Sequence, residues 1–450
     1  MRGLLLSALP KRFRSLDAAR VLIRGTSLAL VIQIAGNGVG YLGQILLARW
    51  LGVNGYGVYA YLFTWVQVFT IGALLGVDLG VVRFIPEFLV TKEYPLLRGI
   101  LRWARWLVLA TGVGLACASA LVFYVFHPIR SSMATLLMGS FSIPLFALIV
   151  VQTEILRSAK RIAWAYGPPI LLQPVLILTA AYGFLRMTGE LTDFHAIAAW
   201  QTAQCVIVVL QGIVIHRVFS RYTRNVPAAY QTRRWLGVAL PLLFYSIFAI
   251  VIPRIDTLAI GLFLGSEEVG IYSAAVKTAT IIGITLAAVN TIISPMIVSH
   301  YTRRDMAGLQ DVVSLATLVS FGVSLLLAAG MVIFSGPILR SFGGEFIRAR
   351  ASLFLLILGQ LINVGMGSVG LLMILTGYEK QSAVILGWSA LIIAVLDFLI
   401  IPAFGIIGAA FVSVLGYLLW NLWIYRLVVK HLGIRASVVD VIGHLLPSKD

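Results

Sequence analysis

Long apolar runs, separated by short polar or basic connections, follow one another along nearly the whole chain. A run of about 20 apolar residues is long enough for an α-helix to cross the hydrocarbon core of a bilayer. Backbone groups inside the hydrocarbon must be hydrogen-bonded to each other, so each run predicts a helix. The twelve predicted helices lie near residues 25–47, 56–78, 104–126, 133–153, 163–185, 194–216, 236–264, 270–297, 312–336, 351–375, 381–402 and 406–429.

The composition supports a membrane protein. The chain has 450 residues, of which 60% are hydrophobic and only 11% charged, and its mean hydropathy is +0.99. A soluble domain carries about 25% charged residues, and even a large soluble fold must cover itself with polar surface. We therefore predict an all-α integral membrane protein with twelve transmembrane helices.

The distribution of Lys and Arg predicts the orientation. Most of the 34 basic residues fall in the N-terminal segment and in every second connection after it. The positive-inside rule therefore places both termini in the cytoplasm, as expected for a multi-pass protein of the cytoplasmic (inner) membrane. We interpret residues 1–24 as a basic amphipathic segment on the cytoplasmic membrane face rather than as a cleavable signal. The net charge of +17 then needs no nucleic-acid partner.

An internal repeat divides the chain into two halves. LGVNGYGVY at residues 51–59 recurs as LGSEEVGIY at residues 264–272, with Leu, Gly, Gly and Tyr at identical spacing. Each copy lies at the outer turn between the first and second helices of its half. An even number of helices separates the copies, which is typical of parallel repeats. The predicted parts are an N-lobe, a basic cytoplasmic linker, a C-lobe and a cytoplasmic tail: residues 25–216, 217–235, 236–429 and 430–450.

Three stretches carry a family resemblance. ARWLGVNGYGVYAY with LLGVDLGVVRFIPEF, then PRIDTLAIGLFLGSEEVGIYSAA, then LDFLIIPAFGIIGAAFVSV resemble the first two, the seventh and eighth, and the last two helices of oligosaccharide flippases. These belong to the multidrug/oligosaccharidyl-lipid/polysaccharide exporter superfamily. The resemblance implies two pseudo-symmetric six-helix lobes around a central cavity that opens alternately to each side. One departure is Asp397, where the family pattern leads us to expect Asn.

The resemblance also implies a substrate and partners. Members move polyprenyl-pyrophosphate-linked oligosaccharides from the cytoplasmic to the outer leaflet for surface polysaccharide synthesis. Partners would then be this lipid-linked oligosaccharide, the membrane lipids, and the glycosyltransferases and polymerase of the same process. Moving such a head group needs a wet polar passage with fixed positive charge, because a bare anion in hydrocarbon is very costly. Because no bond is made or broken, we expect no catalytic residue, metal or cofactor.

Polar side chains that could line such a passage recur in three predicted helices. The first helix carries Gln33, Asn37, Tyr41 and Gln44 at helical spacing, the second adds Thr64 and Gln67, and the tenth adds Gln360 and Asn363. Such a stripe lines a cavity or, alternatively, joins neighbouring helices through hydrogen bonds.

Three charges lie inside the seventh and eighth predicted helices. Asp256 precedes the second repeat motif by a depth of about 13 Å, and Lys277 follows it by about 10 Å, at 1.5 Å per residue. These depths predict an Asp256–Lys277 ion pair between antiparallel helices, which would leave Arg254 for the substrate. The planar guanidinium suits phosphate oxygens, although a purely structural Arg is the alternative.

Three further charges have two interpretations each. Arg49 either guards the exit or is an interfacial Arg whose charge reaches the head-group region. Arg24 either meets the incoming head group or only determines topology. Asp397 is either a protonation or cation site that couples transport, or a hydrogen-bonding partner of a neighbouring helix.

Rival functions remain open. A drug or cation antiporter of the same superfamily would need carboxylates in the cavity, whereas the intramembrane charges here are mostly basic. A membrane polysaccharide polymerase or glycosyltransferase would need a large extramembrane loop or a carboxylate cluster, and the connections are short. A scaffold without transport activity would leave the polar stripe unexplained.

Overall fold

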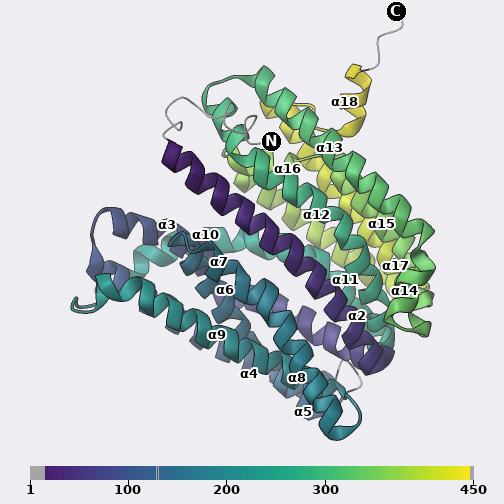
Figure 1. Ribbon diagram of the computed structural model, residues 1–450. Coiled ribbons are helices and arrows are strands. Elements are labelled where there is room, and N and C mark those ends of the chain that lie inside the picture. The colour runs from purple at the N-terminus through teal and green to yellow at the C-terminus, as the bar shows by residue number, and fades with distance from the viewer. Residues whose placement is uncertain (1–15, 128, 130, 446–450) are drawn as a thin grey trace, which may run out of the picture. The chain divides into compact units, whose positions relative to one another are not determined.

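The computed structural model of the protein describes residues 16–127, 129 and 131–445, and every regular element in them is a helix (Figure 1). The side chains of residues 16–30 lie outside this description, as does most of the predicted N-terminal segment 1–24. Nine helices of the described residues are long and apolar enough to cross a membrane.

The described chain forms two compact units. The first unit contains Val31–Ser273 and Ser341–Glu345, and the second contains the described residues before Val31, Ala274–Arg340 and those from Phe346 onward. These units are defined by compactness, whereas the predicted lobes are defined by an internal repeat in the sequence. The lobe boundaries therefore stay a prediction.

The first unit is built around helix α6. Its elements are α2 (Leu16–Leu74, from Val31), α3 (Val77–Val90), α4 (Tyr94–Phe126), α5 (Met133–Ser140), α6 (Ser142–Ser158), α7 (Ile162–Tyr166), the π-helix η2 (Gly167–Leu172), α8 (Gln173–Thr188), α9 (Asp193–Thr223), α10 (Thr232–Val251), the 3-10 helix η3 (Ile252–Arg254) and α11 (Ile255–Leu264). Helix α6 packs against α3, α4 and α9, while α10 packs against α3.

The second unit is built around the long helix α17. Its elements are α12 (Ser266–Thr302, from Ala274), α13 (Met306–Ile333), α14 (Ser335–Phe342, to Arg340), η4 (Gly344–Ala349, from Phe346), α15 (Arg350–Gly365), α16 (Val369–Leu375), α17 (Glu379–Leu432) and α18 (Val438–Leu445). Helix α17 packs against α15 and α16, and α18 packs against α13. The apolar core joins α12, α13, α16 and α17 through side chains such as Ile297, Val313, Leu372 and Val428.

Two predicted helix pairs are each joined end to end by a single glycine. Helix α2 covers the first predicted pair and is non-helical at Gly52, where φ is 69° and ψ is 179°. Helix α17 covers the last pair and is non-helical at Gly405, where φ is 60° and ψ is −147°. Such dihedrals are essentially restricted to glycine, so one residue turns the chain where we expected a short loop.

Other predicted helices are interrupted as well, among them the seventh and the tenth. The seventh, 236–264, is broken by η3, because Pro253 lacks an N–H group and its ring clashes with the preceding turn. The tenth, 351–375, ends at Gly365 and resumes at Val369, with Gly367 at a φ of 71° between them. The continuous helices predicted there are therefore corrected to broken ones.

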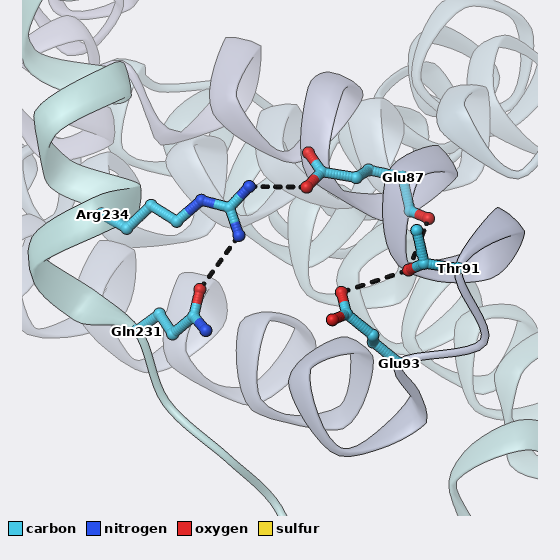
Figure 2. Close-up of polar contacts among 5 residues, drawn as sticks. All are labelled: Glu87, Thr91, Glu93, Gln231 and Arg234. Carbon is cyan, nitrogen blue, oxygen red and sulfur yellow. Dashed lines mark hydrogen bonds and ion pairs between the residues drawn. The ribbon is translucent and has the colours of Figure 1, made fainter.

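Helix α3 occupies residues that the sequence predicted as a cytoplasmic connection, and it is fastened to the start of α10 (Figure 2). Arg234 Nη2 lies 2.6 Å from Glu87 Oε1, and Nη1 donates to Gln231 Oε1 over 3.1 Å. Both members of the ion pair are partly exposed, so it contributes roughly 0–1 kcal/mol. The pair positions the basic linker more than it stabilises the fold.

Candidate functional site

The two copies of the repeat motif share one backbone geometry. Gly52 has a φ of 69° and a ψ of 179°, and Gly265 has a φ of 87° and a ψ of −178°. In both cases a helix ends, turns at the glycine and resumes at once. The sequence repeat is therefore also a structural repeat.

The second glycines of the motifs let the two turns touch. A Cβ atom on Gly57 would clash with the carbonyl of Ser266, and one on Gly270 would clash with the carbonyl of Val53. The Ser266 hydroxyl donates to Asn54 Oδ1 beside the same contact. Small residues permit this close approach of helices in a membrane. The two motif copies thus pack directly against each other within the first unit.

Arg254 lies at the break between α10 and α11. Pro253 has a ψ of 15° and Arg254 a φ of −132°, so neither continues the helix. The guanidinium Nη1 donates to the carbonyl of Ile250 over 2.7 Å. In an unbroken helix this carbonyl would accept from the backbone N–H of residue 254. The side chain of Arg254 therefore satisfies a carbonyl at the break.

The other contact of Arg254 is with a neutral amide. Its Nε donates to Gln67 Oε1 over 2.6 Å, and Nη2 donates to the same oxygen. Gln67 lies in the second part of α2, and both side chains are half-buried. Because an amide carries no net charge, this contact fixes the plane of the guanidinium without cancelling its positive charge.

Asp256 is buried in the first turn of α11, two residues after Arg254. Its carboxylate accepts a hydrogen bond of 2.6 Å from the Tyr272 hydroxyl. It also accepts from Thr257, through the backbone N–H at 2.6 Å and the hydroxyl at 3.2 Å. Hydrogen bonds to the ionised form are what makes a buried carboxylate tolerable. Lys277 belongs to the second unit, and its pairing with Asp256 stays a prediction.

The predicted stripe on the first helix does not coincide with the face that packs. Gly36 and Gly43 face Ile170 and Leu178 of the fifth span, where small residues allow the helices to approach. Gln33 and Gln44 are half-buried and Asn37 is exposed. Gln44 Oε1 accepts a 3.1 Å hydrogen bond from the Tyr56 hydroxyl across the Gly52 kink. Asn37 is thus the exposed member of the stripe, while Gln33 and Gln44 are half-buried beside a glycine face that is used for packing.

Gln360 and Asn363 of α15 face α17 instead. Gln360 Nε2 donates to the Tyr417 hydroxyl over 2.8 Å, and Asn363 Oδ1 accepts from Asn421 Nδ2 over 3.1 Å. Amide bonds between neighbouring helices are typical of packing in a membrane. Both residues belong to the second unit, whereas the first-helix stripe belongs to the first.

Three predicted residues remain. Arg49 is exposed, and its Nε donates to the carbonyl of Ser341 over 2.6 Å. Asp397 is fully buried in α17. Arg24 lies in α2, but its side chain is outside the described part.

The structure adds residues that the sequence prediction of the site left out. Gln67 was one polar residue among several, and only its contact with Arg254 makes it distinctive. The hydrogen bond between Asn54 and Ser266 joins the two motif copies. These residues are far apart in the sequence, so their contact could not be predicted from residue spacing. Ser341 takes part through its backbone carbonyl, for which a sequence carries no signal.

Comparison with known proteins gives two family matches. The family model described as polysaccharide biosynthesis protein matches residues 22–301, and the model described as MatE matches residues 241–399. Among curated proteins, the chain is 24% identical over 410 residues to the probable low-salt glycan biosynthesis flippase Agl15 of Haloferax volcanii, covering 88% of this chain and 81% of that protein. It is 20% identical to the uncharacterized membrane protein MJ1068 of Methanocaldococcus jannaschii, covering 90% and 83%.

Solved structures give the same fold. An inward-facing multidrug resistance MATE family transporter of the MOP superfamily has a TM-score of 0.70 at 14% identity, covering 90% of this chain and 99% of that one. A MOP superfamily transporter from Pyrococcus furiosus, whose binding pocket is described as reversed in polarity, has a TM-score of 0.63 at 14% identity, covering 92% and 96%. An outward-facing MATE transporter has a TM-score of 0.62 at 15% identity, with the same two coverages.

Proposed function

Because this chain belongs to the polysaccharide biosynthesis protein family, whose model matches residues 22–301, we propose that it is a flippase for a lipid-linked oligosaccharide. The substrate would be an oligosaccharide on polyprenyl pyrophosphate, carried from the cytoplasmic to the outer leaflet by alternating access. The chain's likeness to a probable glycan biosynthesis flippase supports this choice. The family and its relatives indicate a transporter rather than an enzyme.

The observation that carries the proposal is the environment of Arg254. An arginine within a transmembrane segment is costly and is retained where it has a function. Here it lies at a break in the helix, and broken helices form substrate sites in many transporters. Its contacts among the described residues are with Gln67 and with the Ile250 carbonyl, both neutral. A guanidinium held in place by these hydrogen bonds is suited to a pyrophosphate, and it also interacts electrostatically with Asp256.

The polar route would include the first-helix stripe. Gln33, Asn37 and Gln44 would contact the glycan hydroxyls, and Arg24 the incoming head group at the inner end. The interhelical bonds of Gln360 and Asn363 make them supports of the C-lobe wall, from which they would reach the glycan only by exchanging partners. Asp397 would be the coupling site for a proton or cation, and the Asp256–Lys277 pair would take part in gating.

We propose twelve crossings with both termini in the cytoplasm. To the nine long apolar helices, the kinks in α2 and α17 add one crossing each. The broken α10–η3–α11 segment adds the third. The basic linker 217–235 would lie on the cytoplasmic side between the two lobes.

Three substitutions, Arg254→Ala, Arg254→Lys and Gln67→Glu, test the role of Arg254, and Arg303→Ala is their control. Arg254→Ala removes two charge-assisted hydrogen bonds to phosphate, worth about 1.5–3 kcal/mol each, so transport should fall about a hundredfold or more. Arg254→Lys keeps the charge but loses the planar fork and should retain part of the activity. Arg303→Ala, on an exposed loop, serves as the control and should behave like the wild type. The readout is delivery of lipid-linked oligosaccharide to the outer leaflet, at matched membrane levels.

The third substitution, Gln67→Glu, separates charge from structure. Glutamate can accept the same hydrogen bonds from Arg254, but it cancels the positive charge. A head-group role predicts that transport drops while folding is preserved. A purely structural role predicts transport as in the wild type, and that result would exclude our proposal.

A drug or cation antiporter is the second candidate. It is favoured by the structural likeness to MATE transporters, which concerns the fold alone. The buried carboxylates Asp256 and Asp397 could serve a cation. Expulsion of a fluorescent cation from vesicles, without movement of lipid-linked oligosaccharide, would support it.

A further inference from the structure

A short segment lies in the outer connection between the predicted ninth and tenth helices. It packs in a different unit from the residues before and after it. Ser341–Glu345 belongs to the first unit, whereas the residues on either side of it belong to the second. The segment contains the last two residues of α14 and the glycines Gly343 and Gly344. It therefore lies with the helices of the N-terminal half.

Phe342 anchors this segment in an aromatic site. Its side chain is fully buried. Its ring meets Tyr41 edge-on, with centroids 5.7 Å apart and planes at 74°, and Tyr56 at 6.5 Å and 56°. Tyr41 and Tyr56 lie on opposite sides of the Gly52 kink. Phe342 thus contacts both arms of the helical hairpin that α2 forms around Gly52. Aromatic contacts of this kind can be broken and formed again when the segment moves.

Arg49 holds the same segment through its backbone. Its Nε donates to the carbonyl of Ser341 over 2.6 Å. Ser341 is in the last turn of α14, where carbonyls lack helical partners and a cation is favourable. Arg49 is exposed, so water can replace this bond and the contact can be made and broken.

We propose that Ser341–Glu345 is a lid on the outer end of the first helical hairpin, with Phe342 and Arg49 as its gating residues. The inference rests on the proposed flippase function, because a lid is needed where a head group leaves toward the outside. Release requires Phe342 to leave Tyr41 and Tyr56 and the Arg49–Ser341 bond to open. Gly343 and Gly344 can absorb the backbone change. Arg49 then controls the exit through the lid rather than by binding pyrophosphate.

A cysteine at Ser341 can report the state of the lid. Ser341→Cys preserves the carbonyl that Arg49 binds and is made after Cys117 and Cys205 are replaced by alanine. Labelling by a membrane-impermeant maleimide in intact cells should be slow compared with Pro337→Cys, an exposed position of the same outer connection. Adding Arg49→Ala should speed labelling about two- to tenfold, the range expected for the loss of one hydrogen bond.

Matched variants separate a lid from a general structural role. Adding Phe342→Ala should speed labelling as Arg49→Ala does, whereas Arg340→Ala, an exposed arginine of α14, should not. Arg49→Lys and Phe342→Tyr should restore slow labelling, because each keeps the relevant contact. Membrane level and thermal unfolding are measured for every variant.

The labelling assay does not depend on transport, so the lid and the proposed function can fail separately. Labelling of Ser341→Cys as fast as that of Pro337→Cys, or unchanged by both Arg49→Ala and Phe342→Ala in folded protein, would overturn the lid. The predicted labelling without any oligosaccharide movement would leave the lid in place and refute the flippase.

Discussion

At residue 254 a guanidinium group lies where a predicted transmembrane helix is broken, and its neighbours determine what it can do. The Ile250 carbonyl and the Gln67 amide fix its position, and neither supplies a negative charge. A structural arginine paired with a carboxylate would have its charge cancelled locally. The contacts at this residue thus fix the geometry of a cationic group, which also interacts electrostatically with Asp256.

The buried carboxylate of Asp256 gives a second test at the residue scale. Tyr272→Phe removes a 2.6 Å hydrogen bond to this group and should lower the free energy of unfolding by about 1.5–3 kcal/mol. Tyr59→Phe is the matched control, because Tyr59 occupies in the first motif copy the position that Tyr272 occupies in the second. The residue equivalent to Asp256 in the first copy is residue 43, which is a glycine and carries no carboxylate. Thermal unfolding in detergent should rank Tyr272→Phe well below Tyr59→Phe. Equal losses would show that the carboxylate gains nothing special from Tyr272.

Single residues were predictable from the sequence only where a charge or amide stood out in an apolar run. That rule found Arg254, Asp256 and the amides of α15. It could not find their partners, since the Gln360–Tyr417 and Asn363–Asn421 bonds join different helices. Partner identity depends on tertiary packing, which a single sequence does not specify.

At the scale of elements, the kinks at Gly52 and Gly265 depend on backbone conformation alone. A Cβ atom at either position would meet no other atom within 4 Å, so only the dihedrals disfavour a side chain. Gly52→Ala and Gly265→Ala should therefore each cost about 1–3 kcal/mol of stability, measured by thermal unfolding, with reduced transport.

Gly38 provides the control for these two substitutions. It also has open space around it, but it lies inside a regular helix. Gly38→Ala should be neutral or stabilise by about 0.5–1 kcal/mol, because alanine is the better helix former. If all three alanine variants unfolded alike, the conformational account of the kinks would be wrong.

The positions of the helices could be predicted better than their ends. Apolar runs locate the spans, because the bilayer fixes the length that a helix needs. The break at Pro253 and the turn at Gly367 lie within runs that remain apolar. Hydropathy alone therefore does not reveal these two interruptions of the helices. Helix α3 was missed because its segment carries charges, one of which, Glu87, pairs with Arg234 of α10.

At the scale of the whole molecule, the repeat, the basic linker and the family membership point to one architecture. The MOP superfamily fold is shared with transporters in both inward-facing and outward-facing states. Gly57 packs directly against Ser266 and Gly270, so the two motif copies are joined within the first unit. Sequence analysis predicted the family and the repeat, but not this contact.

The central claim is that the protein moves a lipid-linked oligosaccharide across the bilayer. The most direct measurement uses proteoliposomes with polyprenyl-pyrophosphate-linked oligosaccharide in both leaflets and an impermeant glycosidase outside. In protein-free liposomes the inner pool should stay protected. The wild-type protein should expose that pool with time, and Arg254→Ala should slow its exposure to nearly the protein-free rate. A protected inner pool in the presence of folded wild-type protein would contradict the account.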